Sequence, residues 1–330
     1  MNIYLLLSLI PYSLFLLILQ LMDAFSLTRW GRLLLTTLAG ILCFLLSALF
    51  FRLLPQWRDH ILFVSVFQEI LKGCIILIMI NHKKIALSGD ATIYGASVGG
   101  GFAIAESLFH TWNLSAPNIG LVLMENFDFA VLHIGCTSTL AQMLIMARNN
   151  TFGNKEWQKQ LGLYFAFFLA ILVHYIHLLE PLPMLAMIIL LSIYFTLSKW
   201  SLFRKNEKYI HRWVDDCINN EIALLANIKR GKLGNTNAGK YLLTLKDQFE
   251  PETFFDMCCF VSEFLELSIA AKSNLLLKEA GLPKREIPEG KARIAELRAL
   301  KQRIGKVGEL ALRPIIPLRD ADQWIVNELI

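Results

Sequence analysis

The chain has 330 residues, of which 55% are hydrophobic, and its mean hydropathy is +0.50. Soluble domains are about 45–50% apolar, so this composition favours a membrane protein. The net charge of +5 is small and both signs are interspersed, which argues against a nucleic-acid-binding surface. No two of the six cysteines have CxxC spacing, so they read as small apolar residues rather than a redox pair.

The charged residues divide the chain into two regions. Residues 1–200 contain 11 Lys/Arg and 9 Asp/Glu, whereas residues 201–330 contain 21 and 18. The sequence therefore predicts an all-α protein with a polytopic membrane helix bundle over residues 1–200. A cytoplasmic helical domain follows over residues 201–330.

The first region contains seven apolar segments, and a membrane-spanning helix needs about 20 residues. In chain order they cover residues 2–22, 33–55, 61–80, 91–112, 127–147, 161–179 and 182–198. The third and fourth are the most polar. The first lacks the basic residues that precede a cleaved signal peptide, so we expect it to be retained as a span.

Basic residues lie mainly in alternate loops. They follow the first, third, fifth and seventh predicted spans: Arg29, Arg32, Lys83, Lys84, Arg148, Lys155, Lys159, Lys199, Arg204, Lys205 and Lys208. The exceptions are Arg52, at the end of the second span, and Arg58, after it. Because cytoplasmic loops are enriched in Lys and Arg, the pattern predicts an N-terminus outside and a C-terminus in the cytoplasm.

Ionisable residues inside the predicted spans point to a functional site. They are Glu69 with Lys72 in the third span, Glu106 in the fourth, His133 in the fifth and His174 in the sixth. A charge in the bilayer centre costs about 2.5–3.5 kcal/mol on the insertion scale. With this topology and a 1.5 Å rise per residue, Glu69, Glu106, His133 and His174 lie roughly 9–12 Å below the outer surface. We therefore expect these side chains to meet.

Helical spacing indicates which faces carry them. Glu69 and Lys72 are three residues apart and Gln68 and Lys72 four, so each pair shares a side of the helix. In the fourth span, small residues recur every four positions and favour close packing of a neighbouring helix. Phe102, Glu106 and His110 lie on or beside the extension of that ridge, so we expect Glu106 to face protein.

Two carboxylates and two imidazoles near a membrane face favour hydrolysis. A buried carboxylate can take a proton from water, and a histidine can protonate a leaving amine or stabilise an oxyanion. No cofactor and no metal ligand are predicted on this interpretation. The same donors could instead hold a divalent metal such as zinc, which would then activate the water.

These residues resemble the motifs of the PrsW family of intramembrane proteases, which is related to the CAAX-prenyl endopeptidases and bacteriocin-processing proteins. The resemblance rests on Gln68-Glu69-x-x-Lys72, on YGASVGGGFAIAES over residues 94–107, and on His133 and His174 in later helices. It implies a multi-pass protease of the bacterial inner membrane. Such an enzyme cleaves a single-span membrane protein, such as an anti-sigma factor, near the outer face.

By motif position, the resemblance implies catalytic roles for Glu69, Lys72, Glu106, His133 and His174, with Phe102 matching as well. Three positions depart from the family pattern. Gln68 replaces the first Glu of Glu-Glu-x-x-Lys, which is thought to be the general base, and Ser107 and Leu178 replace two Asn residues.

These departures leave several roles and functions open. Either Glu69 or Glu106 is the base, or the chain does not hydrolyse. Gln68, Phe102, His110 and His177 are predicted to bind substrate or support the site, and His177 could supply a second imidazole. The alternatives are an inactive membrane scaffold that binds the same helices and a transporter, for which inverted repeats would be expected and none is visible.

Residues 201–330 contain helical patterns at 207–229, 251–280 and 291–310, and Val326 and Ile330 indicate a short final helix. We expect this domain to have a regulatory or oligomerisation role. The predicted partners are the lipid bilayer, a single-span membrane protein substrate and, through the tail, further copies of the chain.

Overall fold

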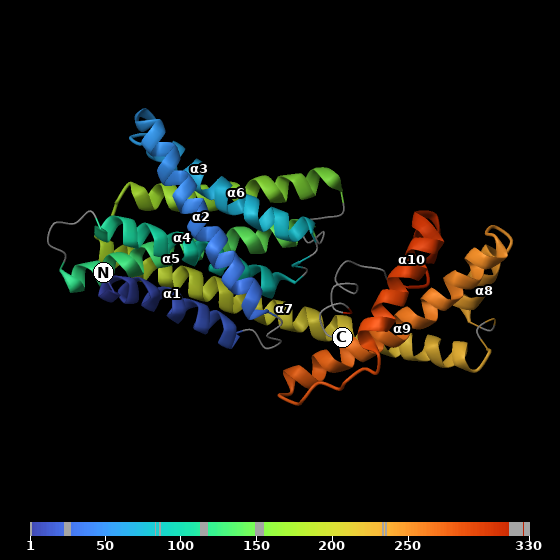
Figure 1. Cartoon of the computed structure of the whole chain (residues 1–330). Coiled ribbons are helices and arrows are strands. Elements are labelled where there is room, and N and C mark those ends of the chain that lie inside the picture. Colours follow the sequence, from blue (N-terminus) through green and yellow to red (C-terminus); the bar gives the residue numbers. More distant parts are fainter. Residues whose placement is uncertain are drawn as a thin grey trace. The chain divides into compact units, whose positions relative to one another are not determined.

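The computed structural model describes residues 2–22, 28–82, 84–85, 87–112, 118–148, 155–232, 234, 236–316 and 326. Every regular element among these residues is a helix, which confirms the all-α prediction (Figure 1). The chain forms two compact units, residues 1–206 and residues 207–330.

Each predicted span falls in its own helix of the first unit. These helices are α1 (Asn2–Met22), α2 (Trp30–Leu53), α3 (Ile61–Asn81), α4 (Ser88–Trp112), α5 (Ile119–Arg148), α6 (Glu156–Leu178) and the first part of α7 (Met184–Lys229). A short 3-10 helix, η1 (Pro55–Trp57), joins α2 to α3.

Five of these helices are long and apolar enough to cross a membrane, among the residues described. They are α2, α3, α5, α6 and the Met184–Arg204 part of α7, and α1 contributes the shorter apolar stretch Leu9–Leu21. The protein is therefore multi-pass. The number of seven spans and their orientation stay predictions.

Helix α4 is not among these five apolar helices, and it lies inside the bundle. All residues from Ala91 to Ile104 are buried, and α4 packs against α5, α2, α1 and α3 (Figure 1). A helix enclosed by other helices contacts protein rather than lipid, so small residues can replace large apolar ones.

Glycines in α4 let the backbones of neighbouring helices touch it. A Cβ on Gly99 would collide with the carbonyl oxygen of His133 on α5, and a Cβ on Gly101 with that of Thr37 on α2. The predicted small-residue ridge therefore faces α5. It also fixes the main chain of His133 against α4, which positions one predicted catalytic residue.

Helix α7 differs from the sequence prediction. We predicted a span ending at residue 198 and a separate amphipathic helix over 207–229, but α7 is one continuous helix. No Pro or Gly occurs between Met184 and Lys229, so the sequence contains no residue that would break the helix.

The second unit contains the end of α7, α8 (Asn237–Leu245), α9 (Pro251–Glu279) and α10 (Gly290–Leu312). Pro251 stands in the first turn of α9, where its missing N–H costs nothing. Apolar residues of these helices form their own core, including Met257, Phe260, Phe264 and Leu300. The helices predicted at 251–280 and 291–310 are confirmed. The predicted final helix lies outside the described residues except for Val326.

Candidate active site

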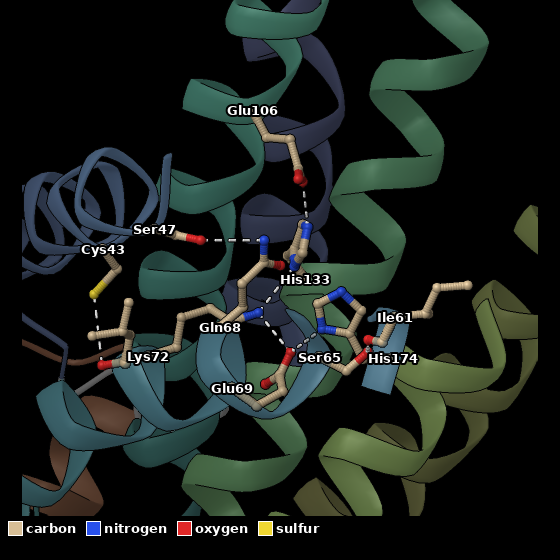
Figure 2. Close-up of polar contacts among 11 residues, drawn as sticks. Cys43, Ser47, Ile61, Ser65, Gln68, Glu69, Lys72, Glu106, His133 and His174 are labelled. Carbon is tan, nitrogen blue, oxygen red and sulfur yellow. Dashed lines mark hydrogen bonds and ion pairs between the residues drawn. The ribbon is translucent and has the colours of Figure 1, made fainter. Parts of the chain in front are cut away.

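Five ionisable side chains from four helices form one connected polar network inside the first unit (Figure 2). Its members are Glu69 and Lys72 of α3, Glu106 of α4, His133 of α5 and His174 of α6. Four of these side chains are at most 2% exposed, whereas that of Glu106 is 22% exposed. We call this set the polar network.

Lys72 lies at the middle of the polar network. Its Nζ donates to Glu69 Oε1 over 2.6 Å and to His133 Nδ1 over 2.9 Å. Because an ammonium only donates hydrogen bonds, His133 Nδ1 must accept, and the neutral ring carries its proton on Nε2. That N–H donates to Glu106 Oε2 over 2.5 Å. Lys72 thereby sets the tautomer of His133.

Glu69 orients the second histidine in the same way. Its Oε1 also accepts from His174 Nδ1 over 2.8 Å, so the neutral His174 ring has an unprotonated Nε2. No described residue forms a hydrogen bond with this nitrogen, which lies on the side of the ring turned toward Glu106 (Figure 2). His174 therefore presents a hydrogen-bond acceptor on the Glu106 side of the network.

The charges of the polar network are not balanced. It contains two carboxylates and one ammonium, and of the two carboxylates Lys72 forms an ion pair with Glu69. The excess negative charge therefore belongs to Glu106, which contacts only a neutral imidazole within the network. Glu106 is also the one member with appreciable exposure, so it is the carboxylate that water can reach.

Two predicted supporting residues pack beside the polar network. Phe102 is fully buried, with its ring centroid 4.6 Å from that of His133 and 4.8 Å from Lys72 Nζ. Gln68 is buried as well, but its Nε2 donates to Ser47 Oγ of α2 over 3.4 Å. Gln68 thus connects α3 to α2 rather than extending the network.

The other two predicted supporting histidines pair with different carboxylates. His177 Nε2 lies 3.0 Å from Asp128 Oδ1, and His177 Nδ1 is buried with no hydrogen-bond partner in the described part of the chain. His110 is half-exposed and lies 3.3 Å from Glu125. Asp128 was not among the residues predicted from the sequence. Asp128 lies at the start of the fifth predicted span and His177 near the end of the sixth, so neighbouring antiparallel spans would bring the two together, which is the signal that could have paired them.

Three members of the polar network, Glu69, His133 and His174, offer possible metal-ligand atoms within 4.8 Å of one another. Two histidines and a carboxylate are a common zinc set, and Glu69 Oε2 is buried without a hydrogen-bond partner among the described residues. The arrangement nevertheless does not fit a metal. The Lys72 ammonium stands between Glu69 and His133, and both nitrogens of His133 are engaged, by Lys72 and by Glu106.

The Glu69–Lys72 pair gives a testable prediction about stability. Glu69→Gln or Lys72→Met alone leaves a buried charge without its partner, which costs about 3–5 kcal/mol. We expect each single variant to lower the Tm of the purified protein strongly. The double variant Glu69→Gln/Lys72→Met should lose much less than the sum, because neither charge of the pair is left without its partner. Additive losses would show that the two side chains are not coupled.

Comparison with known proteins adds an independent finding. A family model described as "PrsW family intramembrane metalloprotease" matches residues 24–198, more than half of the chain. No curated protein and no solved structure matches the chain. The matched range contains all five members of the polar network and the enclosed helix α4. The chain therefore belongs to the PrsW family of intramembrane proteases.

Proposed function

We propose that this protein is an active intramembrane endopeptidase in which Glu106 activates the attacking water and no resident metal takes part. The observation that carries the proposal is the state of Glu106. It is the uncompensated carboxylate of the polar network, it is partly exposed, and it is held by the Nε2–H of His133. Water must be able to reach a general base, and the carboxylate that takes the proton must be held in position. Glu106 meets both requirements.

The chemistry follows from the hydrogen-bonding roles of the side chains. Glu106 Oε1, which His133 does not contact, takes one proton from water while the water oxygen bonds to the scissile carbonyl carbon. His174 Nε2 accepts the other hydrogen of that water and so orients it. The protonated Glu106 then gives its proton to the peptide nitrogen as the C–N bond breaks, leaving a carboxylic acid and an amine.

Glu69 and Lys72 act through other residues in this scheme. Glu69 is fully buried, so it does not contact a substrate, and we assign it as a positioning residue for His174 and Lys72. Lys72 fixes the tautomer of His133 and supplies positive charge behind it while the tetrahedral intermediate carries negative charge. The base is thus Glu106 and not Glu69.

The place of the site in the bundle supports a membrane-protein substrate. Glu106 lies six residues before the end of α4 at Trp112, and His174 four residues before the end of α6 at Leu178. The loop charges predict that this end faces the outside. We infer a single-span substrate of the anti-sigma-factor type, cleaved near the outer face of a bacterial inner membrane.

The proposal predicts that Glu106→Gln abolishes proteolysis. Because the amide cannot take a proton, cleavage should fall by about 100-fold or more. Since the substrate is unidentified, new protein termini in membranes of cells producing the wild type or the variant are compared by mass spectrometry. The matched control is Glu125→Gln, a carboxylate on α5 that pairs with His110 outside the network. Cleavage products that persist in Glu106→Gln and in His133→Ala would refute the proposal.

Metal removal gives a second prediction. Chelators such as EDTA and 1,10-phenanthroline should not reduce cleavage by the purified protein in liposomes. Elemental analysis should find no stoichiometric zinc, because Lys72 supplies the cation of the site. Loss of activity that added zinc restores would instead show a metal bound to Glu69, His133 and His174, with Lys72 displaced.

An inactive scaffold is the second candidate function, and Gln68 is the observation that favours it. Gln68→Glu restores the family residue and separates the two candidates. If Glu106 is the base, the added carboxylate faces Ser47 and should give no gain in cleavage. Products that appear only with Gln68→Glu would show that the natural chain lacks its base and binds helices without cutting them.

A further inference from the structure

A second buried cation lies on α7, outside the polar network. Lys199 is 3% exposed, and its Nζ donates to Thr139 Oγ1 over 2.9 Å and to Gln142 Oε1 over 3.3 Å, both on α5. Both acceptors are neutral, and no described carboxylate forms an ion pair with Lys199. An ammonium has three N–H donors, so one donor and the whole positive charge remain uncompensated. Lys199 lies inside the Met184–Arg204 segment, which extends beyond the predicted span 182–198, and ionisable residues within such segments usually mark functional sites.

Lys199 lines a cavity of about 40 Å³ between α1, α5 and α7. This exceeds the roughly 10–15 Å³ that one water needs. The walls are mostly apolar, with Phe15 and Ile18 from α1, Ile134 from α5 and Phe195 from α7. No member of the polar network lines it, so the cavity is separate from the candidate active site.

The cavity opens toward the lipid. Two of its lining residues, Ile18 and Thr196, are exposed on the surface of the first unit. In a multi-pass membrane protein the exposed surface of spanning helices contacts lipid, so a ligand entering here comes from the bilayer. The basic residues after the seventh predicted span predict that this end of α7 lies at the cytoplasmic face, where anionic lipids give the surface a negative potential.

We propose that this cavity, the Lys199 groove, binds the headgroup end of one anionic phospholipid. The phosphate accepts from the remaining N–H of Lys199 and compensates its charge. The first methylene groups of an acyl chain contact the apolar side chains of Phe15, Ile134 and Phe195. A soluble anion would leave these apolar walls without a partner, and a neutral lipid would leave the charge uncompensated.

The ligand would contact three helices and stabilise the first unit. A ligand that binds only the folded protein raises its stability according to its concentration and affinity. The inference does not depend on proteolysis, because it uses neither Glu106 nor the other members of the polar network.

The test compares the purified full-length protein in phosphatidylcholine nanodiscs with and without phosphatidylglycerol. Phosphatidylglycerol should raise the Tm of the wild type by several degrees, and native mass spectrometry should find one retained molecule. Lys199→Met should lose both effects because the phosphate has no partner. The control Arg204→Gln, an exposed basic residue on the same helix, should retain both.

A second variant keeps the experiment decisive if Lys199→Met does not fold. Ser192→Phe retains Lys199 but fills the groove that Ser192 lines, and it should also lose the retained lipid. No effect of phosphatidylglycerol on the wild type would overturn the proposal. A shift that persists in both groove variants, or one that oleate or inorganic phosphate reproduces equally, would overturn it as well.

Discussion

The buried ammonium of Lys72 is the interaction on which the rest of the site depends. It lies between a carboxylate from its own helix and an imidazole from α5, and it bonds both. Without Lys72, the charge of Glu69 would be unpaired in the bundle, and the proton of the neutral His133 ring would not be fixed on Nε2. The Lys72 ammonium therefore compensates the charge of Glu69 and sets the tautomer of His133. The tautomer in turn determines that Nε2 of His133 donates to Glu106. Glu69 passes the same orientation to His174 through its shared oxygen.

That network needs helices spaced to within a fraction of an ångström, and the enclosed helix α4 provides the spacing. Gly99 meets the carbonyl of His133, so the residue that carries the imidazole rests directly on the helix that carries Glu106. A larger side chain at this point would push α5 away and lengthen the 2.5 Å contact between His133 and Glu106. The low hydropathy of α4 and the geometry of the site are therefore consequences of the same small residues.

The sequence was informative where a property depends on position along a helix. The predicted depth of Glu69, Glu106, His133 and His174 required only span limits and helical rise, and the structure brings these side chains together. Hydrogen-bond partners that depend on the direction of a side chain could not be predicted from the sequence. Gln68 shares a helix side with Lys72, yet its amide reaches Ser47 on α2, and His177 turns to Asp128. The continuity of α7 was missed because a change in polarity was taken for a helix end, although only Gly or Pro would have required one.

The position of Lys72 also bears on the replacement of the first Glu of the Glu-Glu-x-x-Lys motif by Gln68 in this chain. A zinc ion would hold a carboxylate and two imidazoles and polarise what lies beside them. In this chain the cation is the ammonium of the Lys72 side chain. It bonds Glu69 and His133, and through Glu69 it holds His174. Such a cation cannot activate water by coordination, because an ammonium only donates hydrogen bonds. In the proposed mechanism a side chain therefore takes the proton, and among the carboxylates of the network only Glu106 is both uncompensated and reachable by water. In that mechanism Glu106 is the base, so the amide of Gln68 does not remove the base from this chain.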